Sequence, residues 1–272
     1  MRRGAFLALA LLAACLRAPP PDLSRDATGL LEQVSERQSA VRAVRGSARL
    51  GVTSEALSGS LESWLAAEKP GRVRIEVLDF FGNPAAVLVA DGDRFALYDA
   101  RAGVLYRGEA TPDNLSRLIP LPLPAGDLAA MLCGSAPISG GRPAAAEPDG
   151  DAMRLELDGG DGREVLWVGA GGAVRSALFE PRAGSVLRAW HVSFDGFDRR
   201  GGVLFPVDAD LRGAKARVTL HWKRDLEVNP GLDPATFRLD PPRGARVVEL
   251  GSGPPPALDV PIRRAEEGRP EG

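Results

Sequence analysis

Few residues of this 272-residue chain are of the types that perform covalent chemistry: two cysteines, Cys15 and Cys133, and two histidines, His191 and His221. A thiol can act as a nucleophile and an imidazole as a base or metal ligand, but both need suitably spaced partners. The sequence has no HExxH or GxSxG pattern, and no histidine stands near Cys133. Both histidines alternate with apolar residues, which favours the polar faces of strands. We therefore expect no catalytic residue, no metal and no cofactor, although a carboxylate pair formed in space stays open.

Two short motifs are similar to functional sites only in their letters. Asp79 to Gly82 (DFFG) is similar to the metal-binding triplet of kinases, but no phosphate loop or catalytic loop accompanies it. Gly169 to Gly172 (GAGG) follows one predicted strand and precedes another, so it lacks the helix that would hold a pyrophosphate. We interpret it as a hairpin turn.

The first cysteine ends an apolar run. Arg2 and Arg3 precede the apolar segment from Ala5 to Ala14, which is about half of the length that spans a bilayer as a helix and is typical of an export signal. Its end, LAAC, resembles the bacterial lipobox. The resemblance implies a signal peptide at residues 1–14, cleavage before Cys15, a diacylglycerol thioether on its sulfur and an acylated amine. Membrane lipid, reached through the acyl chains of Cys15, is thus an expected partner.

A proline-rich stretch follows the predicted lipidation site. Each buried methylene contributes about 0.8 kcal/mol, so two or more acyl chains hold a protein on a membrane. Pro19 to Pro21 favour an extended chain, and residues 15–29 are expected to be a lipidated N-terminus and linker. Leu16 is not aspartate, which by resemblance to the enteric sorting rule predicts the outer membrane, facing the periplasm.

Composition limits the remaining possibilities. The chain is 44% hydrophobic with a formal charge of −2, and losing two arginines takes the mature chain to about −4. No basic block suggests a nucleic-acid partner. With Cys15 lipidated, Cys133 is the only other cysteine, so stability must come from a hydrophobic core rather than a disulfide.

Short apolar segments separated by Gly, Pro and Asp, at intervals of roughly eight to twelve residues, predict an antiparallel sheet. The segment from Arg72 to Leu78 shows the pattern best, since Val73, Ile75 and Val77 alternate with charged residues. The expected strands are Arg45–Val52, Leu57–Ala66, Arg72–Leu78, Ala85–Ala90, Arg94–Tyr98, Val104–Arg107, Met153–Leu157, Glu164–Val168, Val174–Glu180, Leu187–Phe197, Val203–Leu211 and Ala216–Leu226.

Helices are expected at Leu30–Ala43, which is amphipathic, at Thr111–Leu118, and at Gly126–Cys133, with IPLPLP between the last two. A long antiparallel sheet must cover its apolar face. The predicted fold is therefore mainly β with a few α-helices: a curved antiparallel half-barrel whose concave face is covered by a helical lid, leaving an apolar cavity. The Pro-rich tail, residues 251–272, is expected to be disordered.

The lipobox, the first helix, the helical insert and the closing FRLDPPRGARVVEL (Phe237 to Leu250) together resemble the LolA/LolB superfamily of periplasmic lipoprotein carriers and receptors. The resemblance covers residues 30–250. EVLDFFGNP (Glu76 to Pro84) is similar to the turn whose leucine protrudes in the outer-membrane receptor, with Phe81 at that position and Phe80 in place of a proline. ATPDNL (Ala110 to Leu115) and LPLP (Leu121 to Pro124) are similar to the helical insert of lipoprotein relatives.

The resemblance implies a protein that binds rather than makes bonds. Phe80 and Phe81 are predicted to form a membrane-insertion loop, with turn packing as the alternative. The predicted acyl-cavity lining, each of whose members could instead be ordinary core, is Leu50, Trp64, Val73, Ile75, Val77, Leu88, Leu97, Leu118, Leu128, Met131, Leu132, Trp167, Trp190 and Trp222.

We therefore expect a membrane-anchored periplasmic lipoprotein that binds acyl chains or lipoproteins and helps place lipoproteins in the outer membrane. Its expected partners are lipid or lipoprotein cargo and a periplasmic carrier protein. The alternative is a non-catalytic structural or adaptor lipoprotein that binds a protein partner with the same fold. A weaker possibility is an envelope hydrolase, whose catalytic cluster would be visible only in three dimensions.

Overall fold

The alternating segments assemble into one continuous β-sheet in the computed structural model, which describes residues 19–55, 58–138 and 140–250. The predicted signal peptide, Cys15 and the tail 251–272 lie outside the described residues. The helices are α1 (Ala27–Ser39), α2 (Pro112–Leu115) and α3 (Ala125–Leu132), with 3₁₀ turns η1 (Ala170–Gly172) and η2 (Pro234–Phe237). No helix within these ranges is long and apolar enough to cross a bilayer.

The strands are β1 (Ala43–Ser54), β2 (Ser58–Glu68), β3 (Arg72–Leu78), β4 (Pro84–Asp91), β5 (Arg94–Asp99), β6 (Val104–Glu109), β7 (Arg142–Asp149), β8 (Ala152–Asp158), β9 (Gly162–Gly169), β10 (Ala173–Pro181), β11 (Trp190–Arg200), β12 (Val203–Gly213), β13 (Ala216–Trp222), β14 (Glu227–Val228) and β15 (Arg246–Glu249).

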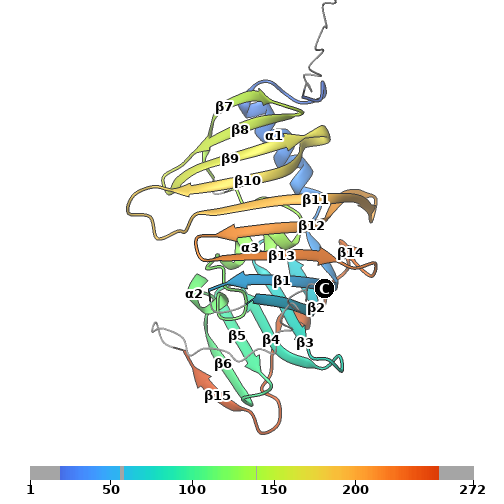
Figure 1. The fold of residues 1–272 in the computed structure, drawn as a ribbon, viewed down its shortest axis with the longest axis vertical. Coiled ribbons are helices and arrows are strands. Elements are labelled where there is room, and N and C mark those ends of the chain that lie inside the picture. Colours follow the sequence, from blue (N-terminus) through green and yellow to red (C-terminus); the bar gives the residue numbers. More distant parts are fainter. Residues whose placement is uncertain (1–18, 56–57, 139, 251–272) are drawn as a thin grey trace, which may run out of the picture.

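The order of the strands is β15-β6-β5-β4-β3-β2-β1-β13-β12-β11-β10-β9-β8-β7, and β14 pairs with β1 beside this path. Pairing is antiparallel except between β15 and β6. Strands β3 to β6 run obliquely to the other long strands of the sheet, β1 and β9 to β13, so the sheet is bent (Figure 1). The sheet is open, with β15 and β7 at its two ends. The predicted mainly-β half-barrel with a helical lid is confirmed.

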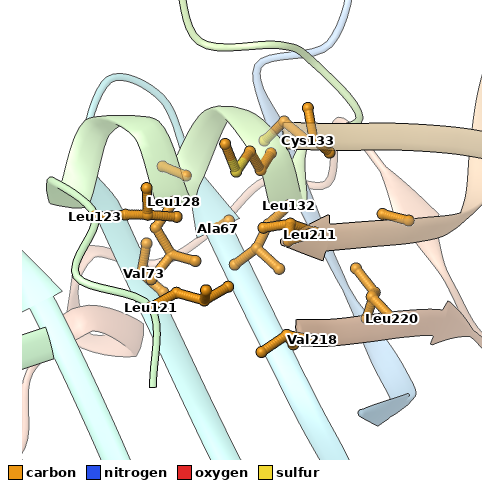
Figure 2. Close-up of a cluster of buried hydrophobic side chains, with 14 of the residues drawn as sticks. Ala67, Val73, Leu121, Leu123, Leu128, Leu132, Cys133, Leu211, Val218 and Leu220 are labelled. Carbon is orange, nitrogen blue, oxygen red and sulfur yellow. The ribbon is translucent and has the colours of Figure 1, made fainter. Parts of the chain in front are cut away.

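Two helices cover the concave face. Helix α1 buries Leu30 and Val34 completely and contacts β7, β8 and β10. Helix α3 contacts β2 and β3, and Figure 2 shows Leu128 and Leu132 of α3 directed toward Val73 and the neighbouring strands. Burying these side chains removes apolar surface from water at about 25 cal/mol per Å², so the helices and the sheet stabilise each other.

The ends of several elements differ from the prediction. The first helix begins at Ala27, because the Asp26 side chain accepts a hydrogen bond from the Gly29 amide as its N-cap, and it ends at Ser39. Residues predicted as linker are already attached to the body: the Asp22 carboxylate accepts a hydrogen bond from the Gly171 amide at 2.9 Å, and the Gln33 side chain donates to the Asp22 carbonyl at 3.0 Å. Part of the segment predicted as linker therefore packs on the body.

Strands β7 and β15 were not expected among the strands, and neither was β14, which pairs with β1 over two residues. Strand β7 reads RPAAAEPD, which lacks β-branched residues and contains two prolines, and only its position at the sheet end tolerates prolines there. Strand β15 is four residues long, and parallel pairing with β6 stabilises it. In both cases tertiary pairing overrides local preference.

The C-terminal segment covers the outer face, defined as the face opposite α1 and α3. Turn η2 contacts β3 and β4, and Leu239 packs on an outer-face cluster formed by Val87, Val89, Ala96 and Leu105. The Arg74 guanidinium donates to the carbonyls of Thr236 and Arg238 at 3.0 and 3.3 Å. This covering explains why β4 is apolar on both faces.

Lys69, at the turn between β2 and β3, ties both helices to the sheet. Its ammonium donates to the Gln38 carbonyl at 2.6 Å, in the last turn of α1, and to the Ser135 hydroxyl at 3.1 Å, just after α3. Burial lowers the pKa of Lys69, and the two acceptors offset part of its lost hydration.

Asp127 stands in the first turn of α3, where the helix dipole favours a charged carboxylate by about 0.3–1 kcal/mol. Burial has the larger effect and raises the pKa of Asp127 to about 6. The folded protein then holds a proton on Asp127 at pH values where the unfolded chain has lost it. Below about pH 4 the carboxyl is neutral in both states and does not reduce the free energy of unfolding. As the pH rises from about 4 to about 6, the free energy of unfolding decreases, because the unfolded chain loses this proton first.

We predict that replacing Asp127 with Asn increases the free energy of unfolding at pH 7 relative to wild type by at most about 3 kcal/mol, and has little effect at pH 4. Urea denaturation of both proteins at the two pH values measures the difference. Asp93→Asn, at an exposed turn, serves as control. An Asp127→Asn effect that is equal at both pH values would show that the carboxyl does not titrate in this way.

Candidate functional site: an apolar cavity with a charged mouth

A cavity of about 610 Å³ opens between the segment joining α2 to α3 and the ends of β1, β11 and β12. Its buried lining is apolar and comprises Leu121, Leu123, Met131, Trp190 and Leu211. The volume lies within the range of about 300–1,000 Å³ that is usual for small-molecule sites. The helical lid therefore fills only part of the hollow of the sheet.

The segment with the sequence IPLPLP forms one wall of the cavity but does not fill it. Prolines lack an amide donor and cannot join a sheet interior, so the segment crosses the concave face as an unpaired strap. Its leucines, two residues apart, turn to the same side and are buried. Figure 2 shows Leu121 and Leu123 directed toward the strands from the connecting segment.

Trp190 forms the wall on the β11 side. It is 7% exposed and stacks on Phe179, with ring centroids 6.0 Å apart and planes at 22°. Stacked aromatic pairs contribute about 0.5–1.5 kcal/mol beyond their buried area. The stack fixes the indole as a rigid apolar surface.

The mouth of the cavity is polar. Arg188, Lys215, Glu55 and Asp113 line it and are exposed, together with the partly buried Ser54 and Ser116. A neighbouring cavity of about 20 Å³ is lined by Asp127, the buried Glu164 and Arg188, among other residues. The site is thus amphipathic, with hydrocarbon at its base and charges at its opening.

The turn between β3 and β4 exposes two aromatic rings. Phe80 and Phe81 are 79% and 83% exposed and meet edge to face, with centroids 5.5 Å apart. The Asp79 carboxylate holds the turn by accepting hydrogen bonds from the amides of Phe81 and Asn83, each at 2.8 Å. Hydrogen bonding, first from Asn83, lowers the pKa of Asp79. The turn itself is therefore well defined.

The cysteine and the histidines lie away from the cavity lining. Cys133 is 1% exposed, and burial raises the pKa of its thiol to about 12, so it is not an activated nucleophile. His191 shares a hydrogen bond with the Ser176 hydroxyl at 2.8 Å, and His221 pairs with Asp208 at 2.6 Å. The described residues contain no group of three potential metal ligands.

His221, on β13, lines a polar groove of about 550 Å³ on the outer face. His191 is on β11, the strand that contributes Ser193 to the same groove. Burial lowers the pKa of His191. Burial alone would raise the pKa of Asp210, but hydrogen bonds from Arg212 and Arg217 outweigh it and lower that pKa to about 2. The charges of this groove are thus largely paired with one another.

Of the predicted lining residues, Met131 and Trp190 line the cavity. Trp64 and Trp167 lie on the outer face, because each alternates with buried neighbours along its strand, and their assignment to the lining is wrong. Trp167 instead donates to Asp149 at 2.9 Å. The other ten are buried in the main core: Leu50, Val73, Ile75, Val77, Leu88, Leu97, Leu118, Leu128, Leu132 and Trp222.

Leu121, Leu123 and Leu211 were missed as lining residues. The alternation of leucine and proline was a signal for the first two, because it marks an unpaired segment with one apolar side. Nothing in the local sequence distinguishes Leu211 from other inward residues of β12.

No protein-family model matches the chain, and no curated protein sequence matches it significantly. Among solved structures, a LolA superfamily protein from Nitrosomonas europaea superposes with a TM-score of 0.55 at 15% identity, covering 79% of this chain and 99% of the other. A putative outer membrane lipoprotein-sorting protein domain from Vibrio parahaemolyticus gives 0.53 at 14% identity, covering 78% and 97%.

A DUF1329 family protein from Desulfovibrio piger gives a TM-score of 0.52 at 10% identity, covering 79% of this chain and 98% of the other. The alignments span nearly the whole length of each of these proteins and about four fifths of this chain. The expected resemblance in architecture is confirmed: the chain has the fold of the LolA superfamily.

Proposed function

We propose that this chain is a membrane-anchored envelope lipoprotein that binds the acyl chains of lipids or lipoproteins and helps place lipoproteins in the outer membrane. The observation that carries the proposal is the cavity beside Leu121 and Leu123, whose base is apolar and whose mouth is open. Hydrocarbon leaving water for such a site gains about 0.8 kcal/mol per methylene. The work is binding rather than bond-making, without metal or cofactor.

The lipobox-like sequence at Cys15 supports the anchor and the envelope location. Acyl chains on this residue would keep the body at the membrane, where a cavity that shelters hydrocarbon has donors and acceptors of cargo within reach. A periplasmic carrier protein would supply cargo that has to cross the aqueous space.

The exposed turn at Phe80 and Phe81 supports a role at the bilayer surface. Large exposed aromatic side chains rimmed by polar groups are typical of contact sites, and the hydrogen bonds of Asp79 hold them outward. We propose that this turn enters the outer part of the bilayer during release of cargo.

The first prediction concerns the cavity. Unacylated protein lacking the signal peptide should bind a fluorescent long-chain fatty acid, measured by fluorescence titration. Ala214→Trp, at an exposed position in the cavity lining, should weaken binding about tenfold, because losing two buried methylenes forfeits roughly 1.6 kcal/mol.

Ala102→Trp, at an exposed turn between β5 and β6, should leave the affinity unchanged. Absence of uptake by the parent protein, combined with stable co-purification of one envelope protein, would favour the adaptor function instead.

The second prediction concerns the turn. Phe81→Glu should leave the thermal unfolding temperature unchanged, because the side chain is exposed, but should abolish release of lipoprotein cargo into vesicles in a reconstituted transfer assay. Val247→Glu, another exposed apolar position, is the control and should transfer normally. Normal delivery by Phe81→Glu would refute the role of the turn.

A further inference from the structure

The mouth of the cavity carries charges of both signs. Arg188 precedes β11 and Lys215 stands in the turn between β12 and β13, whereas Glu55 follows β1 and Asp113 belongs to α2. Trp190 pairs with Gly213 and Ser54 with Ala216, so the sheet register places the β10–β11 loop, the β12–β13 turn and the end of β1 in succession along one edge. Arg188 and Lys215 each stand two residues beyond the Trp190–Gly213 pair, and Glu55 stands one residue beyond the Ser54–Ala216 pair, beside the turn that carries Lys215.

These two cations are available to a ligand. Within the described ranges, neither Arg188 nor Lys215 takes part in an ion pair or a side-chain hydrogen bond, in contrast to the nearby Arg212, which binds Asp210 at 2.8 Å. Most arginines on the outer face have a carboxylate partner, as Arg45 and Arg217 do. Two neighbouring unpaired cations repel each other, and an anion placed between them would remove that repulsion.

The position of the cations relative to the apolar lining defines the kind of molecule that fits. Trp190 lies two residues after Arg188 and is buried at the cavity wall, and Leu211 lies four residues before Lys215. A ligand with hydrocarbon against these side chains would place its polar end at the cations. The guanidinium can bind two oxygens of one anionic group while the ammonium contacts a third.

We propose that Arg188 and Lys215 form a headgroup site for an acyl amphiphile with an anionic, oxygen-rich headgroup, either a phosphate or a carboxylate. The carboxylates Glu55 and Asp113 at the same mouth repel such a headgroup, and so favour its placement at the two cations. The inference rests on the proposed binding of hydrocarbon in the cavity, and it adds a selectivity that an apolar pocket alone does not have.

The test compares three ligands with the same acyl chain: a lysophosphatidylglycerol, the free fatty acid and a monoacylglycerol. Affinities are measured by competition against a fluorescent fatty acid, using unacylated protein. The wild type should bind both anionic ligands more tightly than the neutral one. Exposed ion pairs contribute about 0.2–1 kcal/mol each, so the double variant Arg188→Gln/Lys215→Gln should bind the anionic ligands roughly fivefold more weakly and the monoacylglycerol unchanged.

Further arms identify the headgroup and the polarity of the mouth. The ligand that loses more affinity in the double variant identifies phosphate or carboxylate as the preferred group. Glu55→Gln/Asp113→Asn should strengthen binding of anionic ligands, and raising the salt concentration should weaken it through screening. The control Arg182→Gln/Lys223→Gln removes two cations outside the cavity lining. It should leave the affinities for the anionic ligands and for the monoacylglycerol unchanged.

The outcomes separate the two proposals. Equal affinities for anionic and neutral ligands, or equal losses in the double variant, would overturn the headgroup site while leaving hydrocarbon binding intact. Failure of the wild type to bind any of the three ligands would overturn the proposed function itself. Binding of anionic ligands that needs Arg188 and Lys215 and declines with salt supports the headgroup site.

Discussion

A single sheet cannot exclude water from its own concave face, and the rest of this structure is a response to that constraint. Most strands of the sheet direct apolar residues to the concave side, and the part of the chain that the structure describes has two helices long enough to cover part of that side. Helix α1 covers strands β7 to β10, and α3 covers β2 and β3. Between the two helices, the concave face is covered by the segment from Leu121 to Pro124. Its prolines cannot pair with strands, and the cavity lies between this segment and the sheet.

This arrangement places two kinds of chemistry close together. Buried leucines and a stacked tryptophan form the base of the cavity, and exposed charges, among them Arg188, Lys215, Glu55 and Asp113, surround its opening. The same sheet keeps its outer face polar through paired charges such as Asp210 with Arg212 and Arg217. Arg188 and Lys215 at the mouth, in contrast, have no ion pair within the described ranges.

The sequence predicts much of the fold because, when one face of a sheet is buried, apolar and polar residues alternate along each strand. Strand β3 was predicted with its observed bounds, since Val73, Ile75 and Val77 alternate with charged residues. Strands β7 and β15 carry no such signal, because their pairing depends on neighbours that are distant in the chain.

The cavity was harder to predict than the sheet. Alternation shows that a residue is buried or exposed, but Trp64 and Trp167 are large apolar residues on the outer face, where an aromatic ring can lie partly buried among polar side chains. Whether an inward residue contacts a helix or an empty space depends on where α3 ends, and this is set by tertiary packing. Of the predicted lining residues, Met131 and Trp190 are the two that contact this cavity.

The hydrogen bond between Asp22 and the Gly171 amide limits how the body could lie on a membrane. Asp22 lies seven positions after Cys15 in the sequence, a span of at most about 25 Å when fully extended. A lipid on Cys15 would therefore keep the end of the sheet near β9 and β10 beside the bilayer. Phe80 and Phe81 lie in the turn between β3 and β4, and five strands lie between β3 and β10 in the sheet (Figure 1). Both ends could touch a flat bilayer together only if the molecule reclined, with its long axis parallel to the lipid surface.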